Sequence, residues 1–127
     1  MRVFKIKPFA RFARSEGIAD RTLRQAIERA ETGLIDANLG GGVIKQRVAR
    51  PGKGRSGGYR TVIAYRSAHR AVFAYGFAKN ERDNIGPAEL ARWRQFAAQV
   101  LNWNDDQVEK MLASDAWQEV KSDEEDG

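Results

Sequence analysis

Apolar residues recur along the chain at two spacings, which predict strands and helices in a definite order. Residues 2–6 alternate as a short strand does, with Phe4 and Ile6 on one face. Pro8 suits the first turn of a helix that ends near Gly17. The chain is therefore predicted to begin with a strand that leads directly into a helix.

A second helix follows, and its apolar residues form a stripe with helical spacing. The stripe consists of Leu23, Ala26, Ile27, Ala30 and Leu34. Asp20 is a suitable N-cap because a carboxylate accepts hydrogen bonds from the unpaired amides of a first turn. Gly33 is expected to end the regular part of this helix. These features predict a pair of helices after the first strand.

Three extended segments come next, at residues 43–50, 59–66 and 71–78. The glycine-rich stretch 51–58 between the first two is predicted to be a loop. The last two are joined by a short turn that ends at His69, which predicts a tight antiparallel hairpin. At such a turn, His69 is expected to be an exposed residue rather than a catalytic base, because a general base needs a cleft around it.

The last third of the chain is predicted to be helical. Pro87 begins a helix with an apolar stripe, and Asn104 with Gln107 has the spacing of a capping box that opens another helix. The apolar residues of the first helix are Leu90, Trp93, Ala97, Val100 and Leu101. We expect residues 1–86 to form the core of the domain, residues 87–121 to pack on it as helices, and residues 122–127 to be a disordered acidic tail.

Length and charge refine this organisation. The chain has 127 residues and a net charge of +5, and one domain is expected at this length. Residues 1–82 hold 18 Lys and Arg against 6 Asp and Glu, whereas residues 83–127 hold 4 against 11. The first two thirds are therefore strongly basic. Clustered cations bind nucleic acid because neutralising phosphates releases counterions, so a polyanion partner is expected.

The composition also excludes several classes of protein. There is no cysteine and only one histidine, which excludes disulfide scaffolds, thiol nucleophiles and most metal sites. No run of 18 apolar residues or secretory signal is present, so we expect a cytoplasmic protein without membrane contact. The glycine-rich stretches lack the Gly-Lys-Ser/Thr ending of a nucleotide triphosphatase. We expect neither a metal nor a cofactor.

Cations collect on the predicted strands and on the loop between them. Nine of the ten Lys and Arg residues between positions 45 and 82 form this set: Lys45, Arg47, Arg50, Lys53, Arg55, Arg60, Arg66, Lys79 and Arg82. Alternation along a strand places Lys45 and Arg47 on one face, and pairing of the strands would bring Arg60 close to the Lys79 and Arg82 end. Glu81 is the only carboxylate between residues 45 and 82. Paired-carboxylate hydrolysis and two-metal chemistry therefore lack ligands, and the available chemistry is that of cations acting on phosphate.

Ordered motifs in this basic region resemble the RelE/HigB-like toxins of bacterial type II toxin–antitoxin systems. They are Val-Ile-Lys-Gln-Arg at 43–47, Gly-Tyr-Arg at 58–60 and Phe-Ala-Lys-Asn-Glu-Arg at 77–82, with a helical pair in front. The longer stretches 33–47 and 75–85 resemble one branch of this family that carries a C-terminal helical segment. The chain departs from the best-studied members where they have lysine, arginine and tyrosine: Val43, Asn80 and Gly86 stand there.

The resemblance implies an α+β fold, with a compact antiparallel sheet preceded by a helical pair and followed by a C-terminal helical extension. It also implies a metal-independent endoribonuclease that cleaves ribosome-bound mRNA through the RNA 2′-hydroxyl, inhibits translation and arrests growth. Carried over by position, the implied catalytic residues are Lys45, Arg60, Lys79, Glu81 and Arg82. Residues expected to contact RNA are Arg47, Arg50, Lys53, Arg55 and Tyr59.

The resemblance implies three partners: the ribosome, its mRNA, and a cognate antitoxin of the helix-turn-helix DNA-binding type. Two alternatives stay open. ParE-like relatives with the same fold inhibit DNA gyrase by binding, and a basic domain of this kind can also bind RNA without cleaving it. The cation set of Lys45, Arg60, Lys79 and Arg82 favours the ribonuclease.

Overall fold

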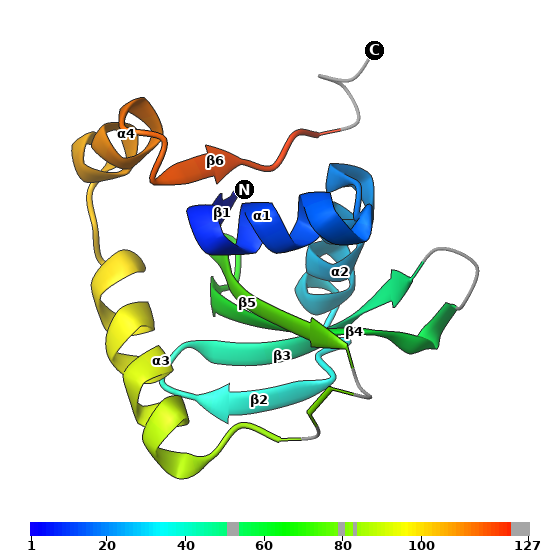
Figure 1. The fold of residues 1–127 in the computed structure, drawn as a ribbon. Coiled ribbons are helices and arrows are strands. Elements are labelled where there is room, and N and C mark those ends of the chain that lie inside the picture. The colour runs from blue at the N-terminus through cyan, green and yellow to red at the C-terminus, as the bar shows by residue number, and fades with distance from the viewer. Residues whose placement is uncertain (51–53, 79–80, 83, 123–127) are drawn as a thin grey trace.

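The computed structural model describes residues 1–50, 54–78, 81–82 and 84–122, with only the backbone described at 54–56 (Figure 1). Along the chain the elements are β1 (Arg2–Ile6), α1 (Lys7–Glu16), α2 (Asp20–Glu31), β2 (Ala37–Gly40), β3 (Val43–Arg50), β4 (Gly54–Arg66), β5 (Arg70–Ala78), α3 (Pro87–Val100), α4 (Asp105–Ala113) and β6 (Trp117–Glu119). None of the helices described is long and apolar enough to cross a membrane.

Six strands form one sheet in the order β2-β3-β4-β5-β1-β6. All neighbouring strands are antiparallel except β1 and β5, which run parallel with Val3 opposite Ala71. The helical pair lies between β1 and the rest of the sheet in the sequence, and such a long connection lets two parallel strands pair. The α+β prediction, with a mostly antiparallel sheet, is therefore confirmed.

Both faces of the sheet are covered by helices. On what we call the first face, α1 and α2 pack through Phe9, Leu23 and Ile27. On the second face, α3 and α4 pack through residues that include Val100 and Val108 (Figure 1). Strand β3 shows how the sequence separates the two faces, because successive side chains of a strand point to opposite sides. Its residues Val43, Lys45 and Arg47 belong to the second face, and Ile44, Gln46 and Val48 belong to the first.

Three sequence predictions about these elements were wrong. The short strands β2 and β6 were not predicted, because four and three residues carry too little periodicity to be recognised. Strand β4 begins at Gly54, within the stretch predicted to be a loop. Asp20 is the first residue of α2 and not its cap: its carboxylate accepts from Lys5 Nζ at 2.6 Å and from the Lys121 amide at 3.0 Å. It therefore joins β1 and the end of the chain to α2.

Other local predictions are confirmed. Helix α1 ends at Gly17, which adopts a left-handed conformation. The turn between β4 and β5 contains His69. Asn104 and Gln107 exchange both hydrogen bonds of a capping box at 2.9 Å. Each of these features depends on a few neighbouring residues, which is why the sequence alone identifies it.

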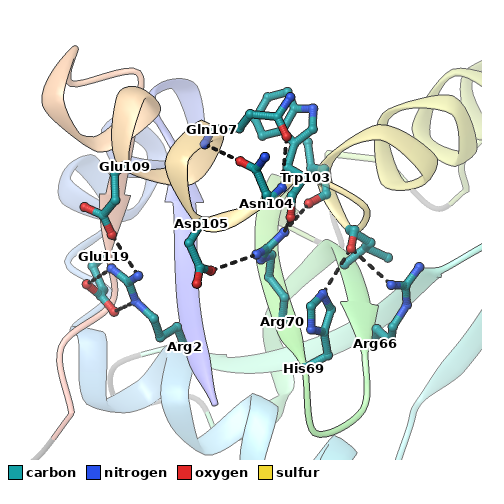
Figure 2. Close-up of polar contacts among 12 residues, drawn as sticks. Arg2, Arg66, His69, Arg70, Trp103, Asn104, Asp105, Gln107, Glu109 and Glu119 are labelled. Atoms are coloured by element: carbon teal, nitrogen blue, oxygen red, sulfur yellow. Dashed lines mark hydrogen bonds and ion pairs between the residues drawn. The ribbon is translucent and has the colours of Figure 1, made fainter.

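A cluster of basic side chains at the β4–β5 turn holds the C-terminal end of α3 (Figure 2). Arg70 is 6% exposed, and its Nη1 donates to the carbonyls of Val100 at 2.7 Å and Trp103 at 2.9 Å. Arg66 Nη1 and His69 Nε2 both reach the Leu101 carbonyl, at 3.1 and 3.0 Å. Carbonyls at the end of a helix lack partners within the helix and carry partial negative charge. The turn thus docks α3 on the sheet.

Replacing Arg70 with alanine is expected to lower the free energy of unfolding by about 3 kcal/mol, because the buried carbonyl of Val100 and the partly buried carbonyl of Trp103 lose a charged donor. Urea denaturation followed by circular dichroism measures this change. Arg92→Ala, at an exposed position on α3, is the matched control and should change the free energy of unfolding by less than about 0.5 kcal/mol. Equal stability of the Arg70→Ala protein and the wild type would show that these contacts do not dock α3.

Candidate active site

Two rows of side chains occupy the second face where β3, β4 and β5 lie side by side. The first row consists of Lys45, Val62 and Tyr75, and the second consists of Arg47, Arg60 and Phe77. Each row contains residues that are directly opposite one another in the strand pairing. The rows are two residues apart along each strand, so they are neighbours on the same face. This arrangement confirms that Lys45 and Arg47 share a face, and it also places Arg60 directly opposite Arg47.

The guanidinium of Arg60 lacks a partner in the part of the chain that the structure describes. Its Nη1 atom is buried and makes no hydrogen bond. The residue opposite it on β3 is Arg47, a charge of the same sign. A buried donor without an acceptor costs free energy, and like charges opposite one another in a sheet repel. Both costs would fall if an anion bound at Arg60.

Lys45 is half-buried on the neighbouring row. No hydrogen bond or ion pair joins its ammonium group to any other described residue. Several other cations pair with carboxylates, as Arg2 does with Glu119 and Glu109. Lys45 and Arg60 are therefore positive groups whose charge is not neutralised by the described residues.

Arg47 differs from these two because Asp36 neutralises it in part. The Asp36 carboxylate accepts from the Arg47 backbone amide at 2.6 Å and from its Nη2 at 3.3 Å. Burial alone would raise the pKa of Asp36, but these hydrogen bonds and the charges of Arg47 and Arg29 lower it. Asp36 thus stays ionised at neutral pH. Arg47 nevertheless remains exposed, so an anion can still approach it.

Arg82 lies beside the second row but uses its donors within the protein. Nη2 and Nη1 bind the two carboxylate oxygens of Glu89 at 2.6 and 3.2 Å, and Nη1 also reaches the Tyr75 hydroxyl at 3.2 Å. Nε and Nη2 donate to the Asn84 carbonyl. The guanidinium also lies over the rings of Tyr75 and Phe77, 5.6 and 5.4 Å from their centres. Since a guanidinium has five N–H groups and five contacts are made, Arg82 has no donor left for RNA.

Tyr59, an expected RNA contact, faces the other side of the sheet. Its side chain is 2% exposed, packs edge-on against Phe12 of α1 and donates from its hydroxyl to Glu16 at 2.9 Å. Burial first, and then the bond to Glu16, raises the pKa of Tyr59. The guanidinium of Arg50 lies over the Tyr59 ring, 5.6 Å from its centre, so Arg50 is on this side of the sheet as well. Stacking of a base on Tyr59 would require the core to open.

The remaining expected site residues cannot be placed in the same way. Lys53 and Lys79 lie outside the described residues, and Arg55 is described only as backbone of β4. The described part of the site therefore brings together Lys45, Arg47 and Arg60, with Arg82 beside them.

Two residues of this region, Tyr75 and Glu89, were not predicted from the sequence. Tyr75 is on the same face as Lys45, and alternation from Phe77 would have placed it there. Glu89 lies in the first turn of α3, which is expected after Pro87, but its position over Arg82 depends on how α3 docks on the sheet. Only the position of Tyr75 could therefore have been predicted from the local sequence.

One family model matches nearly the whole chain. Its description is RelE toxin of RelE / RelB toxin-antitoxin system, and it covers residues 1–120. The match therefore includes the C-terminal helices and β6 as well as the basic strands. The comparison with curated proteins finds no match.

Proposed function

Because the chain belongs to the RelE toxin family of toxin–antitoxin systems, we propose that it is an endoribonuclease that cleaves ribosome-bound mRNA and thereby stops translation. A cognate antitoxin, expected to be a helix-turn-helix DNA-binding protein, would neutralise it. The toxin would act in the bacterial cytoplasm, where translating ribosomes are found.

The observation that carries the proposal is the buried Nη1 of Arg60 beside the ammonium group of Lys45, neither of which has a partner among the described residues. A phosphodiester carries one negative charge and oxygens that accept hydrogen bonds, so it satisfies both groups. During cleavage additional negative charge develops on the phosphoryl oxygens, and donors fixed in advance stabilise it. Arg60 would therefore bind the transition state more strongly than the substrate.

The reaction would use a nucleophile that belongs to the RNA itself. The 2′-hydroxyl attacks the adjacent phosphorus. Lys45 would stabilise the negative charge that develops if it is an ammonium group, or would accept the proton if it is the neutral amine. Arg47, exposed on the neighbouring row, would hold a phosphate of the backbone. No metal is required in this scheme, which agrees with the scarcity of carboxylates between residues 45 and 82.

Induction of the protein in bacterial cells, followed by mapping of mRNA ends, tests this function. We expect growth arrest and new 5′ ends that keep a fixed phase with the reading frame, because cleavage would occur on the ribosome. Intact messages together with a DNA-damage response would instead indicate gyrase inhibition. Growth without new ends would indicate an RNA-binding protein that does not cleave, and either result would overturn the proposal.

A further inference from the structure

The second face also carries a chain of hydrogen bonds that runs from Glu89 through Arg82 to the hydroxyl of Tyr75. We propose that Tyr75 donates the proton to the oxygen that leaves during RNA cleavage, and that Arg82 and Glu89 are positioning residues for its hydroxyl. This inference rests on the proposed ribonuclease function and assigns the acid of that reaction.

Only one of the three tyrosines of the chain is suitable for this role. The hydroxyls of Tyr59 and Tyr65 donate to the carboxylates of Glu16 and Glu31 on the first face. Their protons are therefore engaged on the side of the sheet opposite the cations. Tyr75 lies on the second face, in the same row as Lys45.

The direction of the hydrogen bonds leaves the Tyr75 proton available. Arg82 Nη1 lies 3.2 Å from the Tyr75 hydroxyl oxygen. A guanidinium can only donate, so the oxygen of Tyr75 accepts this bond and its own O–H is free to point elsewhere. No acceptor for that proton is found in the described part of the chain.

The order of the strands places Lys45 and Tyr75 on either side of β4, the strand that carries the phosphate-binding Arg60 in the neighbouring row. Lys45 is on β3, Arg60 on β4 and Tyr75 on β5. Neighbouring strands are about 4.8 Å apart, so Lys45 and Tyr75 are separated by about 10 Å across the sheet. Attack by the 2′-oxygen requires the leaving 5′-oxygen on the far side of the phosphorus. A phosphate over β4 would thus have its nucleophile toward Lys45 and its leaving group toward Tyr75.

The proposed step balances in atoms and charge. The bond between phosphorus and the 5′-oxygen breaks as the 2′-oxygen bonds to phosphorus, and the proton of the Tyr75 hydroxyl moves to the departing oxygen. The products are a 2′,3′-cyclic phosphate and a 5′-hydroxyl. The phenolate that remains lies next to the positive guanidinium of Arg82, which stabilises it until water returns the proton.

Glu89 and Trp93 on α3 hold this arrangement in place. Glu89 binds Arg82 through both oxygens, and the bond from Arg82, opposed in part by burial, lowers the pKa of Glu89, so the carboxylate stays ionised at neutral pH. Trp93 stacks on Tyr75 with ring centres 6.0 Å apart and donates to Glu89. The first turns of α3 are therefore part of the site, because they fix the ring and the hydroxyl partner of Tyr75.

A substrate with sulfur in place of the leaving 5′-oxygen isolates the role of the acid, because a thiolate leaves without a proton. We compare Tyr75→Phe with wild type on ribosomes programmed with a short RNA that contains either atom at the cleavage site. On the oxygen substrate we expect Tyr75→Phe to lose at least about 100-fold in single-turnover rate. On the sulfur substrate the variant should stay within about fivefold of wild type.

Glu89→Gln is expected to lower the single-turnover rate about 10-fold on the oxygen substrate and to change it little on the sulfur substrate. When Glu89→Gln is combined with Tyr75→Phe, we expect no further loss of rate. Tyr65→Phe, on the first face, is the control and should cleave both substrates at the wild-type rate. Equal losses by Tyr75→Phe on both substrates, or no loss on either, would overturn the proposal while leaving the ribonuclease function intact. A wild-type protein that cleaves neither substrate would overturn both.

Discussion

Replacing Arg60 with methionine is expected to abolish growth arrest and to lower the rate of mRNA cleavage by at least about 1000-fold. Methionine keeps most of the aliphatic volume of arginine but removes the guanidinium that would bind the phosphate. The same substitution removes a buried donor that has no acceptor among the described residues, and a like charge opposite Arg47. We therefore expect the free energy of unfolding to stay equal or to rise by about 1 kcal/mol.

Loss of activity with unchanged or higher stability is a combination that a merely structural arginine would not give. Cleavage by programmed ribosomes and urea denaturation measure the two quantities on the same preparation. Arg11→Ala is the matched control, since it removes an exposed arginine from α1 on the other face and should change neither. An Arg60→Met protein that still arrests growth would show that Arg60 is not the phosphate-binding residue.

Gly58→Ala is expected to destabilise the protein by at least about 3 kcal/mol, a large part of the stability of a domain of this size. A Cβ atom at this position would lie 2.1 Å from the Val48 carbonyl oxygen and 3.1 Å from the Arg50 amide nitrogen. Both are backbone atoms of the paired strand β3, at the point where the β3–β4 register shifts. Neither can move without breaking the strand pairing that aligns Arg60 with Arg47.

Solubility on expression and urea denaturation test this expectation. Gly86→Ala is the control, because a Cβ there meets no atom within 4 Å and the backbone φ of −71° suits alanine. We expect that change to alter the free energy of unfolding by less than about 1 kcal/mol. A well-folded Gly58→Ala protein with wild-type stability would show that β3 and β4 do not approach so closely at this position.

The Gly-Tyr-Arg motif thus combines three different roles in consecutive residues. Gly58 allows two strands to approach, Tyr59 packs against α1 on the first face, and Arg60 projects from the second face. From the sequence, both Tyr59 and Arg60 were expected to act on RNA. Alternation along the strand separates them, because neighbouring residues must point to opposite sides of the sheet. Only the contacts of Tyr59 with Phe12 and Glu16 show which side is covered.

The cations of β3 and β4 could be placed from the sequence because strand alternation and hairpin pairing are local rules. The prediction for Arg82 was limited for a different reason. The proximity of Arg82 to Arg60 follows from the strand pairing. The ion pair with Glu89, which occupies N–H groups of Arg82, depends on where α3 docks. That docking is fixed by Arg70 and the turn around His69, at the opposite end of α3. Contacts between elements so far apart in sequence carry no periodic signal.

A ribosome-bound mRNA in which one nucleotide at the cleavage site lacks its 2′-hydroxyl tests most directly whether the protein cleaves RNA through that hydroxyl. With the natural message we expect purified protein to produce a 2′,3′-cyclic phosphate and a 5′-hydroxyl end. With the single 2′-deoxy nucleotide we expect no cut at that position, because the nucleophile is missing while every other contact is retained. Cleavage of the deoxy message at the same position, or no cleavage of the natural one, would contradict the account.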